Sequence, residues 1–264
     1  MVFEDFHVHS NFSDGKNSPE EIVSAAVAMG MTRLGISDHG YAAYDADCCI
    51  PKERLEEHRR TVDALKEAYA GQIELFCGVE QDFFSDAPTD GYDYVIGSVH
   101  YLYLDGGYCA VDDTPEKLLE ATERFFNGDA YAVAEEYFRT VAQVAERTGC
   151  DLIGHFDLIS KFNEKQPLFD PAHPRYTAAW QAAADALLKT GKPFEINTGA
   201  ISRGWRTEAY PAREILAYLR DRGARFVLSS DSHSADTLCF DFPRQERAAA
   251  DLGLRLEHFT PPER

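Results

Sequence analysis

Two histidines stand two residues apart near the start of the chain, in the stretch MVFEDFHVHSNFSDG. The residues that precede them are aromatic and β-branched, which predicts a short strand. Because side chains alternate between the two faces of a strand, His7 and His9 would point the same way and Val8 the other way. Two neighbouring imidazoles can hold one metal ion, and they could equally be polar residues at an exposed strand end. The pair alone leaves both interpretations open.

Polar residues follow the other predicted strands in the same way. Mostly apolar runs predict seven strands, at residues 3–8, 33–37, 73–79, 94–99, 151–156, 193–198 and 225–229. Six of the nine histidines fall at the ends of these strands, where chance would scatter them. The polar residues at the strand ends are His7, His9, Asp38, His39, Glu80, His100, His155, Asp231 and His233. Only the sixth strand, which ends in Glu195-Ile196-Asn197-Thr198, lacks an obvious metal ligand.

Helical segments alternate with these strands. Ser18-Pro19-Glu20-Glu21 is typical of a capping box with proline at the first helical position, and Gly30 should end that helix. Further helices are predicted at 52–70, 176–190 and 212–222. The alternation predicts an α/β fold, a parallel barrel one strand short of the usual eight, with residues 1–264 as a single domain. A doubly wound open sheet is the alternative, but no GxGxxG follows the first strand.

The connection between residues 101 and 150 is longer than the others. It has room for a loop rich in glycine and aspartate, at 105–107, and for two helices. We expect it to form a lid or an insertion at the rim of the barrel, because long connections in compact domains are commonly functional.

The composition disfavours several classes of protein. The formal net charge is −19, and a uniformly acidic surface repels phosphate backbones, which argues against broad binding to nucleic acid. No stretch is apolar for long enough to span a membrane, and the acidic start of the chain does not resemble a signal peptide. We therefore expect a cytoplasmic protein. In that compartment its six cysteines, which show no CxxC spacing, should be free thiols, although the adjacent Cys48 and Cys49 could form a redox or soft-metal site.

The number and type of the donors at the strand ends indicate more than one metal ion. In parallel barrels the catalytic residues sit at the carboxyl ends of the strands. A zinc-like site takes about four ligands, so nine nitrogen and oxygen donors suggest two or three ions that share a carboxylate. The set contains no thiolate, which favours Zn, Fe or Mn. Ions a few ångströms apart hydrolyse phosphate esters or amides, because they activate a bridging water and neutralise developing charge.

The motifs resemble those of a known family. FHVHSNFSDG, ISDH, GVEQDF, GSVH, IGHFD and SSDSH, in this order, are similar to the motifs of the polymerase-and-histidinol-phosphatase (PHP) superfamily, over nearly the whole chain. The runs GSVHYL, GHFDLISKFN, EINTGAISRG and LSSDSH resemble the histidinol-phosphate phosphatase branch more than any other. The resemblance implies a distorted (β/α)7 TIM-like barrel with a trinuclear metal centre at the carboxyl ends of its strands.

The resemblance also implies which residues bind which ion. One ion would be bound by His7, His9, Glu80 and Asp231, a second by Glu80, His100 and His155, and a third by Asp14, His39 and His233. The carboxylate of Glu80 would bridge two of the ions. Some related proteins have histidine where this chain has Asp14.

Three residues are candidates for binding a phosphate group at the same rim. Lys161 and Arg203 each lie six residues after a strand-end residue, so both could reach over the metal centre from their loops. Asn17 stands at the start of the first helix, where backbone N–H groups favour anions. Arg206 is a weaker candidate. Each of them could instead be a solvated loop residue.

The substrate that the resemblance implies also carries an ammonium group and an imidazole. These groups suit a carboxylate and aromatic side chains. The candidates are Asp82, Phe83, Phe84, Tyr101 and Tyr103, which follow the third and fourth strands.

Four polar residues are not expected to bind metal directly. Asp38 should orient a ligand imidazole. His58 lies on the apolar stripe of the helix at 52–70 and should be a packing or surface histidine, while His173 lies in a loop flanked by prolines and His258 lies near the C-terminus. Replacing any of these three histidines by alanine should leave the metal content unchanged.

Together with the resemblance, these residues predict a metal-dependent phosphomonoesterase of histidine biosynthesis. It would hydrolyse L-histidinol phosphate, a small phosphate monoester, by attack of a metal-bridging hydroxide, without nucleic-acid or membrane partners. The residues expected to act in catalysis are Glu80, Asp231, His39 and His233, of which the last three could pass a proton to the leaving alkoxide. The alternatives are a PHP phosphoesterase for a nucleotide or phosphotyrosine, a non-catalytic metal-binding barrel, and a metal-dependent amidohydrolase. No feature of the sequence indicates an oligomeric state.

Overall fold

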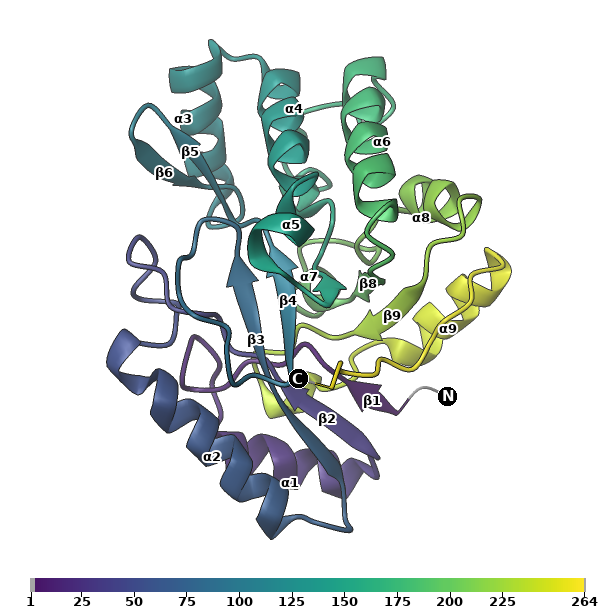
Figure 1. The fold of residues 1–264 in the computed structure, drawn as a ribbon. Coiled ribbons are helices and arrows are strands. Elements are labelled where there is room, and N and C mark those ends of the chain that lie inside the picture. Colours follow the sequence, from purple (N-terminus) through teal and green to yellow (C-terminus); the bar gives the residue numbers. More distant parts are fainter. Residues whose placement is uncertain (1–2, 264) are drawn as a thin grey trace.

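The barrel is built from parallel strands. The computed structural model describes residues 3–263. The strands follow the order β1-β2-β3-β4-β7-β8-β9, and every neighbouring pair is parallel (Figure 1). Their bounds are β1 Glu4–Asp5, β2 Arg33–Ile36, β3 Glu74–Asp82, β4 Tyr94–Ser98, β7 Leu152–Ile153, β8 Phe194–Asn197 and β9 Phe226–Ser229. A parallel bridge between Val8 and Ser232 connects the first strand region to the last, so the sheet is nearly closed. The predicted barrel, and not the open sheet, is therefore confirmed.

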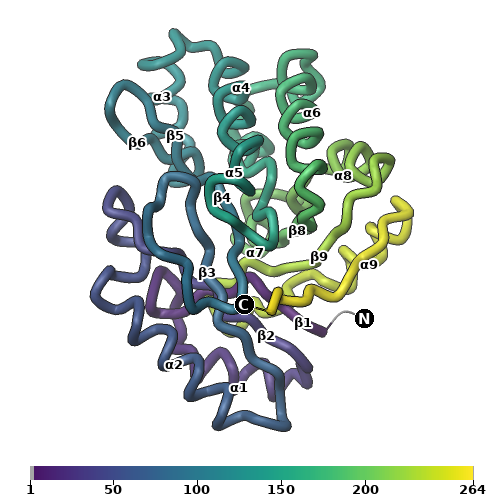
Figure 2. The backbone as a smooth tube through the Cα atoms, in the orientation of Figure 1, coloured from purple at the N-terminus to yellow at the C-terminus, as the bar shows by residue number. Residues whose placement is uncertain are grey.

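Helices cover the outside of the sheet. They are α1 Pro19–Met29, α2 Leu55–Ala68, α3 Pro115–Phe126, α4 Ala130–Val141, α5 Val144–Thr148, α6 Pro174–Leu188, α7 Gly199–Ser202, α8 Arg213–Arg220 and α9 Phe242–Asp251, with short 3-10 turns η1 Lys52–Arg54, η2 Leu158–Ser160 and η3 Ala235–Thr237. α1 packs against α2, α4 packs against both α3 and α6, and α6 packs against α8 (Figure 2). Of the helices in the described part of the chain, none combines the length and the apolar character needed to cross a membrane.

The start and stop signals of the helices act as predicted. Ser18 and Glu21 make both hydrogen bonds of the capping box at the start of α1, and Gly30 ends the helix in the left-handed conformation with φ of 78°. The helix predicted at 52–70 is η1 followed by α2, and those predicted at 176–190 and 212–222 correspond to α6 and α8. These helices of the barrel could therefore be predicted from local sequence signals.

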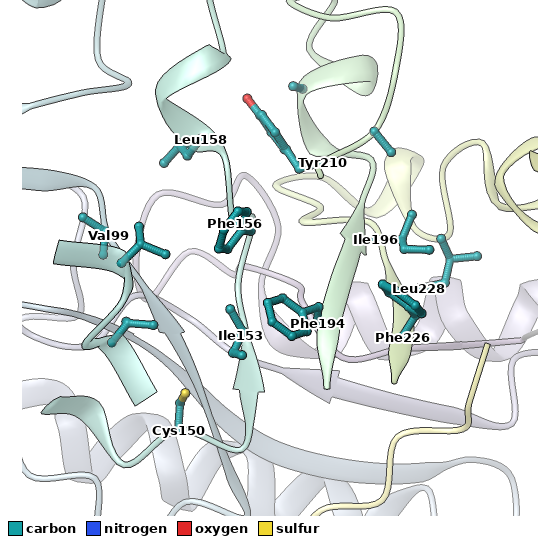
Figure 3. Packing of buried hydrophobic residues seen from close by; sticks show 14 of the residues in the cluster. Val99, Cys150, Ile153, Phe156, Leu158, Phe194, Ile196, Tyr210, Phe226 and Leu228 are labelled. Atoms are coloured by element: carbon teal, nitrogen blue, oxygen red, sulfur yellow. The ribbon is translucent and has the colours of Figure 1, made fainter. Parts of the chain in front are cut away.

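An apolar core lies behind the strands and holds them in place. Phe156 follows β7, while Phe194 and Phe226 lie at the starts of β8 and β9, and all three side chains are at most 1% exposed (Figure 3). The rings of Phe156 and Phe194 pack edge to face, with centroids 5.9 Å apart. Ile196 and Leu228 continue the same packing along the two strands (Figure 3). This packing explains why the strands read as apolar runs, and it provides a rigid base for the strand ends.

The connection between β4 and β7 differs from the prediction. The stretch expected to be a loop is the turn of an antiparallel hairpin, formed by β5 Tyr101–Leu104 and β6 Gly107–Ala110. Asp105 and Gly106 make the turn, with φ of 47° and 82°, as a two-residue hairpin loop requires. Three helices, α3 to α5, follow where two were expected. The hairpin lies beyond the carboxyl ends of β3 and β4, at the end of the barrel where the predicted ligands lie (Figure 1).

Two strands are shorter than predicted because side chains take over their backbone hydrogen bonds. β1 and β7 contain two residues each, where six were predicted. The N–H of Val8 donates to the hydroxyl of Ser37 at 3.1 Å, and the N–H of His155 donates to the carboxylate of Glu195 at 2.9 Å. A backbone donor that binds a side chain is lost to the strand ladder. These two strands therefore stop before the predicted ligands His7 and His155.

Candidate metal centre

Glu80, near the end of β3, lies at the centre of a set of imidazoles. Histidine nitrogens lie 2.9–3.6 Å from its carboxylate oxygens and belong to His7, His9, His39, His155 and His100. Oε2 faces the first three and Oε1 faces the last two, while the hydroxyl of Ser98 donates to Oε1 at 2.5 Å. A carboxylate whose two oxygens face different sets of donors can bridge two metal ions. We call Glu80 with His7, His100 and His155 the inner group.

A second set of donors, the rim group, consists of His9, Asp14, His39 and His233. The carboxylate of Asp14 lies 3.1 Å from His233 Nε2, 3.7 Å from His39 Nε2 and 3.9 Å from His9 Nδ1. One ligand atom from each residue lies within 4.8 Å of all the others, close enough to share an ion. The side chains of Asp14, His39 and His233 are 30%, 16% and 23% exposed, whereas those of Glu80 and His7 are at most 1% exposed. Asp14, His39 and His233 therefore lie on the solvent side of Glu80 and His7, whereas His9, the fourth member of the rim group, is fully buried.

Asp231, in the loop after β9, connects the two groups. Its Oδ1 lies 3.3 Å from His9 Nε2, 3.8 Å from His7 Nε2 and 3.6 Å from His233 Nδ1. Arg203, which follows α7, donates to Asp231 Oδ2 at 2.9 Å and to the Asp231 carbonyl at 3.1 Å. The structure thus gathers all the predicted ligands at the carboxyl ends of the strands, namely His7, His9, Asp14, His39, Glu80, His100, His155, Asp231 and His233.

Glu195, which sequence reasoning did not single out, holds the His7 imidazole and the backbone of His155 in place. This fully buried side chain in β8 accepts hydrogen bonds from His7 Nδ1 at 2.5 Å, the His155 N–H at 2.9 Å and the Ser229 hydroxyl at 2.7 Å. A carboxylate behind a ligand histidine fixes the orientation of the ring. The strand that lacked an obvious ligand therefore supplies the support for its neighbours. The available signal was an acidic residue inside an otherwise apolar strand.

Asp82, which we expected to bind the cationic end of the substrate, has contacts that favour a different role. Its Oδ2 accepts the His100 backbone N–H at 2.8 Å and lies 3.4 Å from His100 Nδ1. Its Oδ1 accepts the Tyr44 hydroxyl at 2.5 Å and the Phe84 N–H at 3.0 Å. Both oxygens are engaged by the protein, and the residue is only 7% exposed. These contacts favour Asp82 as the residue that orients His100, and we revise its role accordingly.

Several buried polar atoms of the cluster have no hydrogen-bond partner among the described residues. They are Glu80 Oε2, His7 Nε2, both ring nitrogens of His9 and His155 Nδ1. A buried polar atom left unpaired costs about 1–3 kcal/mol, so such a concentration of them points to an absent ligand. Imidazole and carboxylate are the donors that Zn, Fe and Mn accept. The residues present therefore fit a metal centre.

Buried carboxylates and imidazoles shift one another's pKa values within the cluster. Burial alone would lower the pKa of His7, but surrounding carboxylates, Glu195 foremost, hold that pKa well above its ordinary value. Burial alone would raise the pKa of Glu80, but the imidazoles around it, His7 foremost, hold that pKa well below its ordinary value. Burial and neighbouring imidazoles lower the pKa of His9 to about 4. The Glu80 carboxylate is thus ionised, and the His9 imidazole neutral, at the pH where a cation would bind.

Asp38 does not contact a ligand imidazole, contrary to our expectation. Its Oδ1 accepts the Ser10 N–H at 2.7 Å and the Ser13 hydroxyl at 2.5 Å, and its Oδ2 accepts the Ser10 hydroxyl at 2.7 Å. The Nε2 of His58 lies 3.0 Å from the same Oδ2, and His58 is fully buried and not at the surface. Of the described residues, the three histidines not expected to bind metal all lie outside the candidate groups.

The two cations predicted to bind phosphate have different partners. Arg203 contacts it directly through the Asp231 carboxylate. Lys161 Nζ donates to the carbonyl of Asp112 at 2.6 Å and to its carboxylate at 3.1 Å. Burial would raise the pKa of Asp112, but Lys161, His100 and His155 lower it, in that order. Lys161 and Asp112 therefore stand on the side of the inner group.

The other two candidates for phosphate are tied into the fold. Asn17 Oδ1 accepts the Ala235 N–H at 3.0 Å, which connects the start of α1 to the loop after β9. Arg206 is 8% exposed, donates to the Ser160 hydroxyl, and lies 3.4 Å from the Asp157 carboxylate. Both side chains have protein partners that account for their positions.

A hollow of about 480 Å³ opens beside the cluster. Tyr44, Tyr101 and Tyr108 line it, and the rings of Tyr44 and Tyr108 stack with centroids 3.9 Å apart. Its charged lining residues are Asp45, Asp47, Asp113, Glu120, Lys117 and Arg124. Burial and nearby carboxylates, Asp14 of the rim group among them, raise the pKa of the lining thiol of Cys48 to about 12. The hollow therefore lies within electrostatic reach of the cluster and is acidic on balance.

Comparison with known proteins identifies the family to which the chain belongs. The model of the PHP domain matches residues 5–199. A protein of Deinococcus radiodurans named a probable histidinol-phosphatase is 31% identical to this chain, over 97% of this chain and 95% of its own length.

Two solved structures share the fold. The first, from Listeria monocytogenes, has a TM-score of 0.79 and 19% identity, over 91% of this chain and 99% of its own. The second is the histidinol phosphate phosphatase of Lactococcus lactis, described in complex with zinc, L-histidinol and phosphate. It has a TM-score of 0.72 and 20% identity, over 98% of this chain and 97% of its own. The family model covers most of the chain and the Deinococcus protein nearly all of it, and this protein accordingly belongs to the PHP domain family.

Proposed function

We propose that this protein is a metal-dependent phosphomonoesterase that hydrolyses L-histidinol phosphate to L-histidinol and phosphate. The observation that carries the proposal is the Glu80 carboxylate, which lies within 3.6 Å of five histidine side chains at the carboxyl end of the barrel. The substrate is supported by the near full-length Deinococcus relative and by the Lactococcus structure, which shares the fold and is described with histidinol and phosphate. Membership of the PHP family supports phosphoester chemistry.

We assign the metal ligands as the family resemblance implies. The first ion would be held by His7, His9, Glu80 and Asp231, the second by Glu80, His100 and His155, and the third by Asp14, His39 and His233. His9 and His39 each belong to two of the candidate groups, which suits positions between adjacent ions. When bound, two or three ions of Zn, Fe or Mn lower the pKa of a coordinated water and neutralise charge on the phosphoryl group.

Side chains of the protein would bind the phosphate group and protonate the leaving group. Arg203, held by Asp231, and Lys161, held by Asp112, would bind the phosphoryl oxygens from two sides. The departing alkoxide needs a proton, and His233 is a candidate donor because it is 23% exposed and so accessible to solvent. His39 and Asp231 are the other candidates. Asn17 would contribute at the start of α1, where backbone N–H groups favour anions.

The organic end of the substrate would occupy the acidic, tyrosine-lined hollow. L-histidinol phosphate carries an ammonium group and an imidazole, which suit carboxylates and aromatic rings. β6 and α3 contribute to the lining, so residues 101–150 would act as a rim insertion of a single domain that spans residues 1–264. Asp45 lines the hollow, whereas Asp82 is engaged by His100 and Tyr44.

We also propose a cytoplasmic location. All six cysteines are free thiols in the structure, as predicted, and free thiols are typical of a reducing compartment. The net charge of −19 disfavours a nucleic-acid substrate.

A panel of phosphate monoesters tests the proposal on metal-loaded protein. We expect kcat/KM for L-histidinol phosphate to exceed that for nucleotides, phosphotyrosine and a simple aryl phosphate. A preference for one of those three would reject the substrate and retain the phosphatase. Bound metal without hydrolysis of any ester would support a non-catalytic barrel, and hydrolysis of cyclic amides alone would support an amidohydrolase.

Substitutions of three aspartates locate the organic end. Asp45→Asn should reduce kcat/KM for histidinol phosphate and spare the aryl phosphate, because only the former has a cationic end. Asp82→Asn should reduce both equally, because it loosens His100. The matched control is Asp105→Asn, at the tip of the hairpin and outside the hollow, in a left-handed conformation that asparagine tolerates. Selective loss in Asp82→Asn would return that residue to substrate binding.

A further inference from the structure

We propose that His58, on the outer helix α2, is a positioning residue for the rim group, which it acts on through Asp38 and the turn that carries Asp14. The proposal rests on the metal centre proposed above. His58 and Asp38 are both fully buried, and His58 Nε2 lies 3.0 Å from Asp38 Oδ2. A buried carboxylate requires such a partner, because an unpaired buried charge is strongly unfavourable.

Asp38 in turn fixes a turn at residues 10–15. It accepts the Ser10 N–H, the Ser10 hydroxyl and the Ser13 hydroxyl, at 2.7, 2.7 and 2.5 Å. The Ser10 carbonyl closes the turn by accepting the N–H groups of Ser13 at 3.1 Å and Gly15 at 2.9 Å. A side chain at Gly15 would meet the His9 carbonyl oxygen at 2.4 Å, so the turn packs tightly against the backbone of a rim ligand. Asp14 lies between Ser13 and Gly15, and the turn therefore dictates where its carboxylate stands.

His58 is itself held from several sides. Its ring packs edge to face on Phe12, with centroids 5.2 Å apart, and its Nδ1 lies 4.0 Å from Cys77 Sγ. Val62, one helical turn further along α2, is fully buried in the core. The contacts thus run without a gap from the outer helix to the turn of Asp14. Asp38 also directly precedes His39, so the same pair supports two ligands of the rim group. This revises our expectation that replacing His58 leaves metal binding unchanged.

The test compares His58→Leu with His58→Gln. Leucine removes the donor to Asp38 at similar volume, whereas the glutamine amide can place an N–H where Nε2 stood. Each variant is equilibrated with graded free Mn²⁺ or Zn²⁺, and bound metal is measured by elemental analysis. We expect His58→Leu to lower the affinity of the rim group for its ion about tenfold to hundredfold, which is the usual effect of losing a partner behind a ligand. The affinities for the other ions should be unchanged. His58→Gln should stay within a few-fold of the wild type.

Two further variants keep the result interpretable. Val62→Ala on the same helix should lower stability without selective loss of metal, since the apolar side chain of Val62 donates no hydrogen bond to Asp38. If His58→Leu does not fold, Ser13→Ala carries the test, because it removes one hydrogen bond to Asp38 from a partly exposed position. Ser13→Ala should lower the metal affinity of the rim group by a smaller factor.

Hydrogen exchange of residues 10–15 in the metal-free protein separates this proposal from that of the metal centre. Faster exchange in His58→Leu than in Val62→Ala would support the coupling even if the wild type bound no metal at the rim. Unchanged metal affinity together with unchanged exchange in His58→Leu would overturn it. Equal loss of all ions in His58→Leu and Val62→Ala would also overturn it, because the effect would then be one of global stability.

Discussion

The inner group lies in a strand or within two residues of a strand end, whereas much of the rim group lies further along the loops. Glu80 lies within β3, and Glu195 of β8 contacts the His7 imidazole and accepts the backbone N–H of His155, all four residues being at 3% exposure or less. Asp14 and His233 lie on loops, are 30% and 23% exposed, and are positioned by hydrogen bonds among side chains and loop backbone.

This difference predicts that one site contains a tightly bound ion and a more weakly bound ion. Ligands in a strand or within two residues of a strand end share the rigidity of the packed barrel, so the inner group is preorganised for metal. Loop-borne ligands depend on a few hydrogen bonds, each of which contributes about 1 kcal/mol. We therefore expect the inner group to bind metal more tightly than the rim group, and mutations to affect the two separately.

The largest expected effect comes from Glu80→Gln, which removes the charge common to the inner group and its neighbours in the rim group. Metal content should fall at two positions together, and turnover should drop to background. The measurement is elemental analysis of the purified variant alongside a phosphatase assay. A variant with full metal content and normal activity would contradict the bridging role.

Arg203→Ala comes next, because Arg203 is not a ligand but stands beside the residue that joins the two groups. We expect kcat/KM to fall by a similar factor for every phosphate ester, equivalent to about 1.5–3 kcal/mol for a lost charge-assisted hydrogen bond. Lys165→Ala is the matched control, since Lys165 is a cation that packs over the ring of Trp205 and has no contact with the cluster. A changed ratio of kcat/KM between histidinol phosphate and an aryl phosphate would show that Arg203 contacts more of the substrate than its phosphate group.

Glu195→Gln sharpens the comparison by loosening only the inner group. Glutamine keeps the size of the side chain but loses the charge that holds His7 and supports His155. We expect metal affinity of the inner group to fall about tenfold to hundredfold, with the ion of the rim group retained. Metal titration followed by calorimetry resolves the two. Equal weakening of both groups would mean that they form one cooperative unit.

The smallest effect is expected for His258→Leu. This side chain is 73% exposed, its Nδ1 lies 2.9 Å from the buried carboxylate of Glu4, and it belongs to none of the candidate metal groups of the described residues. Glu4 keeps Arg33 and the Phe259 N–H as partners, and a contact from an exposed histidine contributes about 0–1 kcal/mol to stability. Metal content and kcat/KM should match the wild type, and a loss of metal would show that the histidines had been assigned wrongly.

Much of the barrel and its ligand set could be predicted from the sequence for a simple physical reason. Parallel strands place their carboxyl ends at one edge, so polar residues that follow apolar runs must converge there. His7 and His9 share a face because strand side chains alternate, and His100 and His155 join them although they lie far along the chain. Local helix signals such as the capping box at Ser18 needed no tertiary information.

The residues behind the ligands could not be predicted, because their roles depend on pairings between distant segments. Glu195 is recognisable as a support only when β8 is known to lie beside β7. From the sequence, His58 is predicted to belong to the apolar stripe of its helix. Its role becomes recognisable only when its contact with Asp38 is known. Asp82 stands two residues after the predicted ligand Glu80, yet its carboxylate contacts His100 and Tyr44, which come from distant segments.

The most direct test of the account is anomalous diffraction from crystals of the protein supplied with less metal than it can bind. We predict an ion at the inner group, coordinated by Glu80, His100 and His155, at higher occupancy than the ion at Asp14, His39 and His233. With excess metal both positions should fill, and Glu80 should bridge two ions. Ions that bind away from Glu80, or a rim group that fills before the inner group, would contradict the account.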